Sequence, residues 1–200
     1  MFAAKLSLLV GLVTITEPSD VPPSDTTSSS TPEDSEDSRS HIPDVLRPST
    51  RPNEISGGLG TKIGLPGGGS IASFPIEFFH HFQNRADGPA IGASLEPSLA
   101  SGIIALNLGP SFRWDFQPMK DLGLYVGPQI TAGYGLFTFT YAGLDRIVSH
   151  VGFLRIAANA RLSLADRSFV FIRPAQITVT ATSSGASATF DILVGGGIAF

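Results

Sequence analysis

The stretch IIALNLGPSFRWDF, residues 103–116, decides the fold because its alternate residues belong to two unlike classes. Its even positions, from Ile104 to Phe116, carry large apolar side chains, and its odd positions are mostly small, polar or charged, including Arg113 and Asp115. Successive side chains of a β-strand point to opposite faces. The stretch therefore predicts one long strand with an apolar face and a polar face.

The same alternation recurs from residue 57 onward and predicts eight strands. Turn-forming residues separate them, and 21 of the 22 glycines lie in this part of the chain. Most of the segments run to ten or more residues, longer than the usual strand of about five or six. Such lengths are typical of a membrane-spanning barrel or a large soluble one. The expected strands are 57–66, 70–82, 90–99, 103–116, 121–136, 149–164, 168–182 and 188–200.

The charges of these segments share the polar face and balance one another. A soluble barrel would place its apolar face inside and its charges in water, where nothing requires balance. A transmembrane barrel is the inverse, and charges enclosed in its lumen must be paired. We therefore expect an all-β, eight-stranded antiparallel up-and-down transmembrane β-barrel with a lumen closed by ion pairs. The expected lumen charges are Lys62, Arg113, Arg155 and Arg161 with Glu77, Glu96, Asp115 and Asp191.

One segment, 168–182, does not separate its charged residue from its large apolar residues. Phe169, Phe171 and Ile177, expected on the apolar face, share parity with Arg173. A β-bulge at the Arg173-Pro174 step would return Arg173 to the lumen.

The N-terminal part of the chain differs from the rest in composition. Residues 1–16 carry Lys5 and then an apolar run that is too short to span a membrane as a helix and suits a probable signal peptide. Residues 17–55 are rich in Pro, Ser and Thr and carry a net charge of −6, from nine acids and three arginines. Such a segment predicts a disordered acidic linker. The barrel is expected over residues 56–200.

The composition also excludes several classes of site. Basic residues are scattered singly, so we expect no nucleic-acid partner. The chain has no cysteine, which excludes disulfides and thiolate metal sites. No spacing of His and carboxylates suits a metal, and we expect no cofactor.

Aromatic residues gather near both expected rims of the barrel, as in interfacial girdles. His80 and His81 flank aromatics and are expected at a rim, facing the interface. The girdle candidates are Trp114, Phe116 and Phe169 at one rim and Tyr134, Phe137, Phe139 and Tyr141 at the other.

Four expected strands contain an internal proline: Pro97, Pro110, Pro128 and Pro174. Proline cannot donate to a strand ladder, so each should mark a bulge or a gap. Counted from the turn near residues 117–120, Pro110 and Pro128 are close to opposite each other. We expect a seam of weakened hydrogen bonding there.

The long loop 137–148 and its flank carry residue types found in acyl transfer, namely Asp145, Arg146, Ser149 and His150. Adjacent residues such as Ser149 and His150 point to opposite faces if the chain is extended, and no nucleophile motif surrounds the serine. We interpret the cluster as a solvated loop.

The last segment, ATFDILVGGGIAF, ends in Phe200, which Ile198, Val194, Ile192 and Phe190 precede at even spacings. In this respect residues 57–200 resemble the small outer-membrane β-barrels of Gram-negative bacteria, of the OmpA-domain and OmpX type. The resemblance implies that Phe200 is the signal read by the barrel-assembly machinery. It also implies that the chain ends and the turns near 83–88, 117–121 and 166–167 face the periplasm.

Three functions remain open at this point. The first is a non-enzymatic bacterial outer-membrane barrel with an envelope structural role or small-solute contact, whose partners are outer-membrane lipid and, during insertion, the assembly machinery. The second is a lipid-modifying acyltransferase or deacylase using Ser149 and His150. The third is a soluble ligand-binding barrel, which would require the apolar face to line the lumen.

Overall fold

The structure is a computed structural model that describes residues 46, 48–65, 69–83, 85–140, 147–183 and 185–200. The expected signal peptide, 1–16, and the expected linker up to residue 45 lie outside the described residues.

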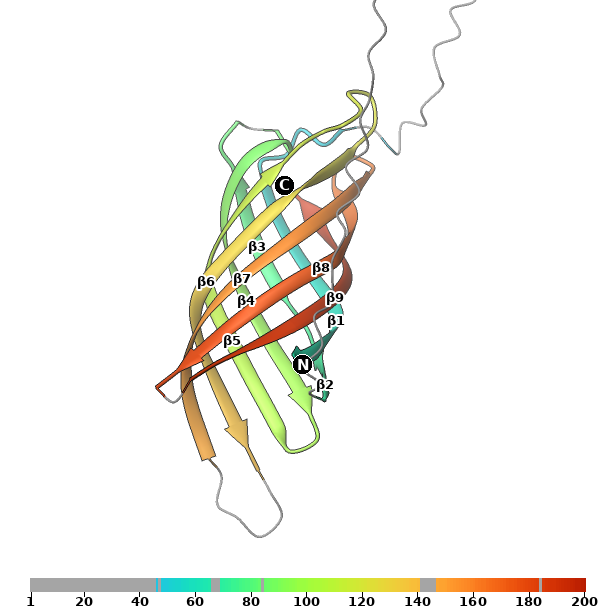
Figure 1. The fold of residues 1–200 in the computed structure, drawn as a ribbon. Helices are drawn as coiled ribbons and strands as arrows, with labels where there is room; N and C mark the ends of the chain where they lie inside the picture. The colour runs from blue at the N-terminus through green and yellow to red at the C-terminus, as the bar shows by residue number, and fades with distance from the viewer. Residues whose placement is uncertain (1–45, 47, 66–68, 84, 141–146, 184) are drawn as a thin grey trace, which may run out of the picture. The chain divides into compact units, whose positions relative to one another are not determined.

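The described chain forms one antiparallel sheet that closes on itself (Figure 1). The strands are β1 (Asn53–Leu65), β2 (Ser70–Ser73), β3 (Ile76–His81), β4 (Gly88–Ala100), β5 (Ile103–Asp115), β6 (Leu124–Phe139), β7 (Ile147–Leu164), β8 (Ser168–Thr182) and β9 (Gly185–Ala199). From β3 onward each strand pairs with the next along the chain, β1 pairs with both β2 and β3, and the first strand pairs with the last over twelve residue pairs, from Glu54–Ala199 to Leu65–Ala188.

β2 and β3 are two pieces of one strand. Both pair with β1 and with β4, and the register is the same on either side of the break. Pro75 lacks an N–H, but Gly58 N donates to its carbonyl at 3.0 Å, and Phe74 N donates to Pro97 O at 2.9 Å. The nine segments therefore make eight strands, and the predicted eight-stranded up-and-down barrel is confirmed.

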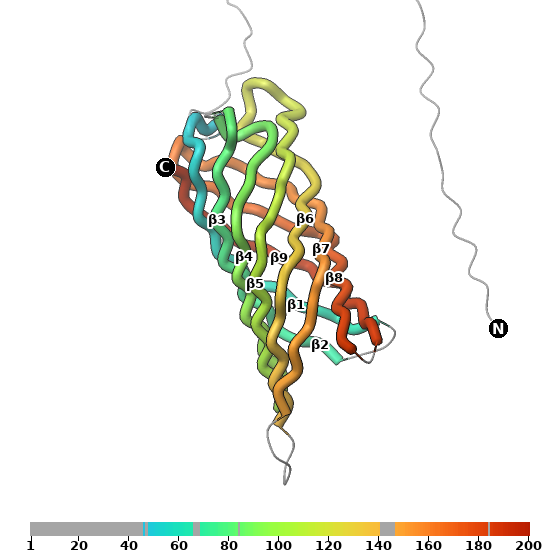
Figure 2. Tube along the Cα trace, turned by 90° about the vertical axis from the view of Figure 1, so that its left-hand side faces the viewer, coloured from blue at the N-terminus to red at the C-terminus, as the bar shows by residue number. Residues whose placement is uncertain are grey.

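Several strand ends differ from the expected ones. β1 begins at Asn53, four residues earlier than expected, because its start pairs with both β3 and β9. The boundary expected between linker and barrel at residues 55 and 56 is therefore too late, and Glu54 is a barrel residue. β6 continues to Phe139, and β7 begins at Ile147. Figure 2 shows β4 to β7 reaching further at one end than β1, β2, β8 and β9.

The outer face of the barrel is apolar and its inside is polar. Large side chains such as Leu59, Ile104, Ile156 and Ile192 are about half exposed around the belt, while the charged side chains of the strands are buried. The soluble-barrel hypothesis required the reverse arrangement and is wrong. No helix of the described residues is long and apolar enough to cross a membrane.

β8 carries the bulge that was expected near Arg173. The registers of both its ladders shift there, and Pro174 and Ala175 both point outward, so that Arg173 and Gln176 both point into the lumen. Phe169 and Phe171 keep the parity of Arg173 and are buried inside. The expectation that these two rings lie on the outer face is wrong.

Glycines of β9 make room for the two rings. A Cβ atom added to Gly195 would lie 2.6 Å from the Phe171 ring, and one added to Gly197 would lie 2.5 Å from the Phe169 ring. Gly195 and Gly197 of the last strand therefore form a packing surface for aromatic side chains of the neighbouring strand.

Each internal proline lies beside an irregularity of the ladders. The β5–β6 pairing skips the rows around Pro110, and it stops at Arg113–Gln129, before the row of Pro128. Pro97 faces the break between β2 and β3, and Pro174 lies in the bulge of β8. Pro110 and Pro128 do not face each other, so the β5–β6 ladder has two separate gaps in place of the single seam we expected.

Candidate functional site: a lumen closed by ion pairs

The charged residues of the lumen fall into three layers along the barrel axis. We call the end where Asn53 and Phe200 exchange backbone hydrogen bonds the terminal mouth, and the other end the opposite mouth. The mouth layer, the middle layer and the far layer follow one another from the terminal mouth inward.

The mouth layer contains Glu54, Arg113, Asp115 and Arg161, all buried. Arg113 donates to Glu54 Oε2 at 2.5 Å and to Asp115 Oδ2 at 2.8 Å. Arg161 forms an ion pair with the other Glu54 oxygen and donates to Asp115 Oδ2 at 3.2 Å. Two cations and two anions therefore form a neutral quartet.

Aromatic rings line this quartet. The Arg113 guanidinium lies 4.2 Å from the centroid of the Phe79 ring, and that of Arg161 lies 4.6 Å from Tyr125 and 5.2 Å from Phe169. Such cation–π contacts supply favourable electrostatics where water is excluded. The inward rings of β8 thus belong to the lumen packing.

The middle layer is built on one ion pair and amide side chains. Arg173 donates to both oxygens of Glu77, at 2.6 and 3.1 Å. Gln129 Nε2 donates to Glu77 Oε1 at 2.9 Å, and Arg173 Nε donates to Asn159 Oδ1 at 2.5 Å. The bidentate geometry and the amides satisfy most of the groups of this buried pair.

The far layer holds the remaining four charges. Arg155 Nη2 donates to Glu96 Oε1 at 2.6 Å, and Lys62 Nζ contacts the same oxygen. Asp191 lies opposite Lys62 in the β1–β9 ladder and accepts a hydrogen bond from Gln176 at 2.6 Å. This layer also contains two cations and two anions.

Among the described residues, the lumen buries five cations and five anions. Eight of these ten are the expected lumen charges, and Glu54 and Arg173 complete the set. Sequence parity placed Arg173 ambiguously, and Glu54 lay in the segment assigned to the linker. The sequence does contain a signal for Glu54. Glu54, Ser56 and Gly58 alternate with Ile55, and this alternation extends the strand by a few residues toward the N-terminus.

Little space remains between the mouth layer and the middle layer. A cavity of about 10 Å³ lies between the mouth and middle layers, next to Arg161, Arg173 and Glu77. One water molecule needs roughly that volume. Six of the buried polar atoms that lack a partner among the described residues belong to the far layer or lie beyond it: Ser73 Oγ, Glu96 Oε2, Ser98 Oγ, Asn107 Oδ1, Thr189 Oγ1 and Asp191 Oδ1. Unmet hydrogen-bonding capacity is therefore concentrated toward the opposite mouth.

The chain crosses the terminal mouth before it enters β1. We call residues 48–52 the strap. Ser49 N donates to the Tyr125 hydroxyl at 3.2 Å, its Oγ donates to Asp166 O at 3.0 Å, and its carbonyl accepts from Ala86 N at 3.4 Å. Ser49 is buried, so the strap covers the mouth layer from outside.

Asp166 holds the next two residues of the strap. Its Oδ1 accepts from Thr50 N at 3.1 Å, and its Oδ2 accepts from Arg51 Nε at 2.9 Å. The hydrogen bond from the Thr50 backbone, together with that from Arg51, lowers the pKa of Asp166 below its ordinary range. This part of the expected disordered linker is therefore tied to the barrel.

The aromatic side chains near the rims fit the girdle in part. Trp114 and Phe116 are exposed and stacked, with centroids 6.2 Å apart, and Phe137 stacks on Phe139 at the other end. Tyr134 is also exposed, whereas Phe169 is inside and Tyr141 lies outside the described residues.

The two neighbouring histidines have different environments. His80 is exposed and bonds Asn53, but His81 is fully buried with Nε2 3.1 Å from Glu54 Oε1. The expectation that His81 faces the interface is wrong because β3 alternates, and only one of two adjacent residues can point outward.

The possible acyl-transfer residues do not assemble into a nucleophile and base. Ser149 and His150 are part of β7, where Ser149 shares the lumen parity of Val151 and His150 is exposed and contacts the Tyr134 hydroxyl. Asp145 and Arg146 lie outside the described residues. No group of three or more His, Cys, Asp or Glu side chains in the described chain could hold a metal ion.

Comparisons with known proteins bear on the fold. No family model and no curated protein matches the sequence. The crystal structure of Neisserial surface protein A (NspA) matches with a TM-score of 0.58 at 9% identity, and the match covers 76% of this chain and 98% of that one. The chain has the fold of a small outer-membrane β-barrel.

Two further outer-membrane barrel structures match at lower scores. They are the N-terminal β-barrel domain of Pseudomonas aeruginosa OprF, with a TM-score of 0.47 at 11% identity, and Ail of Yersinia pestis, with 0.48 at 11%. They cover 74% of this chain and 98% and 97% of their own. We rest the outer-membrane barrel fold on NspA and on the inverted distribution of polar and apolar residues.

Proposed function

We propose that the chain is a non-enzymatic β-barrel protein of a bacterial outer membrane, with a closed lumen and an envelope structural role or contact with small solutes. The apolar belt supports the membrane setting, because a soluble barrel gains nothing by exposing rows of Ile, Leu and Phe. The outer-membrane barrel fold supports the choice of membrane.

The observation that carries the proposal is the filled lumen. Each of the three layers is neutral, and the space left between two of them is that of about one water molecule. An ion crossing such a lumen would have to break buried ion pairs, which cost several kcal/mol each to disrupt. The barrel should therefore act as a closed body in the membrane.

Two partners follow from the proposal. The belt binds outer-membrane lipid, and Phe200 is the residue that the barrel-assembly machinery reads during insertion. Phe200 is half exposed at the end of β9, on the same outer face as Ile198 and Val194, and so is open to a reader.

The strap supports an orientation of the barrel in the membrane. It holds the N-terminal segment at the terminal mouth, where Phe200 also lies, so both ends of the barrel leave on one side. In the outer membrane that side would be the periplasm.

The experiment that tests the proposal measures insertion and conductance together. The full chain is refolded into phosphatidylcholine vesicles, run on a detergent gel with and without boiling, and added to a planar bilayer. A band that shifts on boiling and a bilayer without conductance steps are expected. The variant Glu77→Ser with Arg173→Ser removes the middle pair without leaving a buried charge, and it should stay without conductance steps because the mouth and far layers still close the lumen.

Two results would overturn the proposal. A chain that stays in water as a monomer without detergent would not be a membrane barrel. A wild-type barrel that produces conductance steps in the bilayer would not be closed. The enzymatic alternative is not supported, because Ser149 and His150 point to opposite faces of β7.

A further inference from the structure

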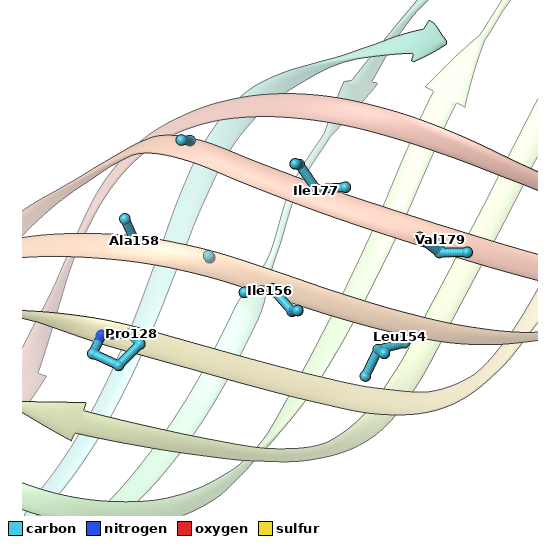
Figure 3. A pocket seen from close by; sticks show the side chains of 8 residues that line it. Pro128, Leu154, Ile156, Ala158, Ile177 and Val179 are labelled. Atoms are coloured by element: carbon cyan, nitrogen blue, oxygen red, sulfur yellow. The ribbon is translucent and has the colours of Figure 1, made fainter. Parts of the chain in front are cut away.

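The outer belt carries a hollow across β6, β7 and β8 (Figure 3). The hollow has a volume of about 470 Å³, and every residue that lines it is apolar. We call it the belt groove.

The belt groove arises from a row of small residues. Pro128 lies opposite Ala158 in the β6–β7 ladder, and Ala158 lies opposite Ala175 in the β7–β8 ladder. Larger side chains stand beside this row: Ile156 opposite Ile177, and beyond them Leu154 opposite Val179. The low row beside these taller side chains produces the hollow, and Figure 3 shows the lining side chains as sticks.

The bulge of β8 contributes to the same hollow. It turns both Pro174 and Ala175 outward, so a small residue occupies a place where regular alternation would have put a lumen residue. The same irregularity brings Arg173 to Glu77 inside. One local distortion thus serves the middle layer on one side of the wall and the belt groove on the other.

The position of the belt groove limits what can fill it. Ala158 and Ala175 precede Asn159 and Gln176, which point into the middle layer, so the groove lies at the height of that layer, away from both rims. In a bilayer this height is hydrocarbon, and lipid headgroups do not reach it. A cavity of about 150 Å³ already holds benzene, so the belt groove has room for a run of methylene groups.

The geometry points to the belt groove as a binding site for one acyl chain of a membrane lipid, held in preference to the rest of the belt. This inference rests on the proposed membrane barrel. The apolar lining offers no hydrogen-bond partner that a polar ligand would need. Transfer of methylene groups from lipid to the groove gains little hydrophobic free energy, so shape complementarity is what selects the site.

The test uses a lipid that reports its own contacts. The full chain is inserted in phosphatidylcholine vesicles that contain phosphatidylcholine with a diazirine at the middle of one acyl chain, and after irradiation the cross-linked residues are mapped by mass spectrometry. Cross-links on the segments around Ile156 and Ile177 should exceed, severalfold, those on an equally exposed belt residue at the same height but away from the groove, such as Ile76 beside Glu77 on β3.

Filling the belt groove should abolish this excess. Ala175→Leu places a larger side chain on its floor, and Ala158→Leu is a second variant that does so from the neighbouring strand. The matched control is Ala93→Leu, an exposed alanine on β4, four strands from β8, which should leave the pattern unchanged.

The outcomes separate the two levels of the proposal. Without a heat-shifted band in the same samples, the membrane barrel itself fails. With that band present, even labelling around the belt, or an excess that survives both filling variants, overturns the acyl-chain site. Cross-linked dimers with an unlabelled groove would overturn it in favour of a second copy of the chain.

Discussion

Arg173 and Glu77 are 96 residues apart in sequence and meet across the lumen through two N–H···O bonds of 2.6 and 3.1 Å. The pair joins β8 to β3, two strands that are not neighbours in the sheet. A contact of this kind ties opposite walls together, which backbone ladders cannot do.

Breaking this pair on one side should destabilise the barrel strongly. Arg173→Met leaves the Glu77 carboxylate buried without its cation, which costs roughly 3 to 5 kcal/mol. The measurement is the urea midpoint of unfolding in detergent micelles, followed by the heat-shifted band. Adding Glu77→Gln to Arg173→Met should recover much of the loss, and a double variant no better than the single one would show that the charge pair is not the cause.

A side chain at Gly195 should disturb the aromatic packing of β8. Gly195→Val puts a Cβ 2.3 Å from the Gly57 carbonyl oxygen and 2.6 Å from the Phe171 ring, and overpacking of this kind typically costs about 1 to 3 kcal/mol. The free energy of unfolding in micelles measures the loss. Gly152→Val is the matched control, because nothing lies within 4 Å of a Cβ at that outward glycine, and an equal loss there would contradict the explanation.

A charged side chain at mid-height of the belt should lower the stability of the barrel more than one at the end of the belt. Ile156→Arg places a guanidinium among hydrocarbon chains and should cost roughly 2 to 4 kcal/mol, whereas a site near the interface should cost about 0 to 1. Ile147→Arg, at the start of β7, is the comparison. The fraction folded into vesicles at a series of urea concentrations reports both, and similar losses would argue that residue 156 does not face lipid.

The strap should loosen in acid. Because hydrogen bonds from Thr50 and Arg51 lower the pKa of Asp166, its carboxylate stabilises the strap above the ordinary pKa of 3.8, and this contribution is lost as the pH falls through the lowered value. The Thr50 amide chemical shift, followed by NMR in micelles, should titrate with a midpoint below 3.8.

Two variants check the assignment of that titration. Asp166→Asn should remove the titration of the Thr50 amide, and Asp121→Asn, in the exposed turn before β6, should leave it in place. A midpoint at or above the ordinary value would mean that the Asp166 carboxylate does not hold the strap in solution.

Alternation in the sequence was sufficient to predict the barrel and its polarity. Residues 103–116 alternate without a break, and β5 presents them as expected, with Arg113 and Asp115 inside and Phe112 and Trp114 outside. The balance of charges on the polar face distinguished a transmembrane barrel from a soluble one. That balance can be counted from composition and from the alternation of residues alone.

Residues beside irregular backbone were harder to predict. The Arg173-Pro174 step predicts the bulge of β8. It does not predict whether the residues before the bulge or those after it point into the lumen, because that depends on tertiary packing. Phe169 and Phe171 are inside because Gly195 and Gly197, close in space but distant in sequence, leave them room. Nothing in the local sequence of β8 contains that information.

The segment before β1 was misjudged for a different reason. Its composition is that of a disordered chain, and composition does not show that single residues such as Ser49 and Thr50 have partners more than a hundred residues away, at Asp166. Long-range hydrogen bonds of this kind contribute order without hydrophobic burial.

The ladder between β1 and β9 joins the two strands that are furthest apart along the chain. Because closing so long a loop has an unfavourable entropy, these bonds should form after the local hairpins. Until then the folding chain is an open ribbon with a free β1 edge and a free β9 edge, and the last residue, Phe200, completes the circle by bonding Asn53. Until this step both edges expose unpaired N–H and C=O groups that another strand could pair with, so closure removes the last template for association of the barrel with another chain.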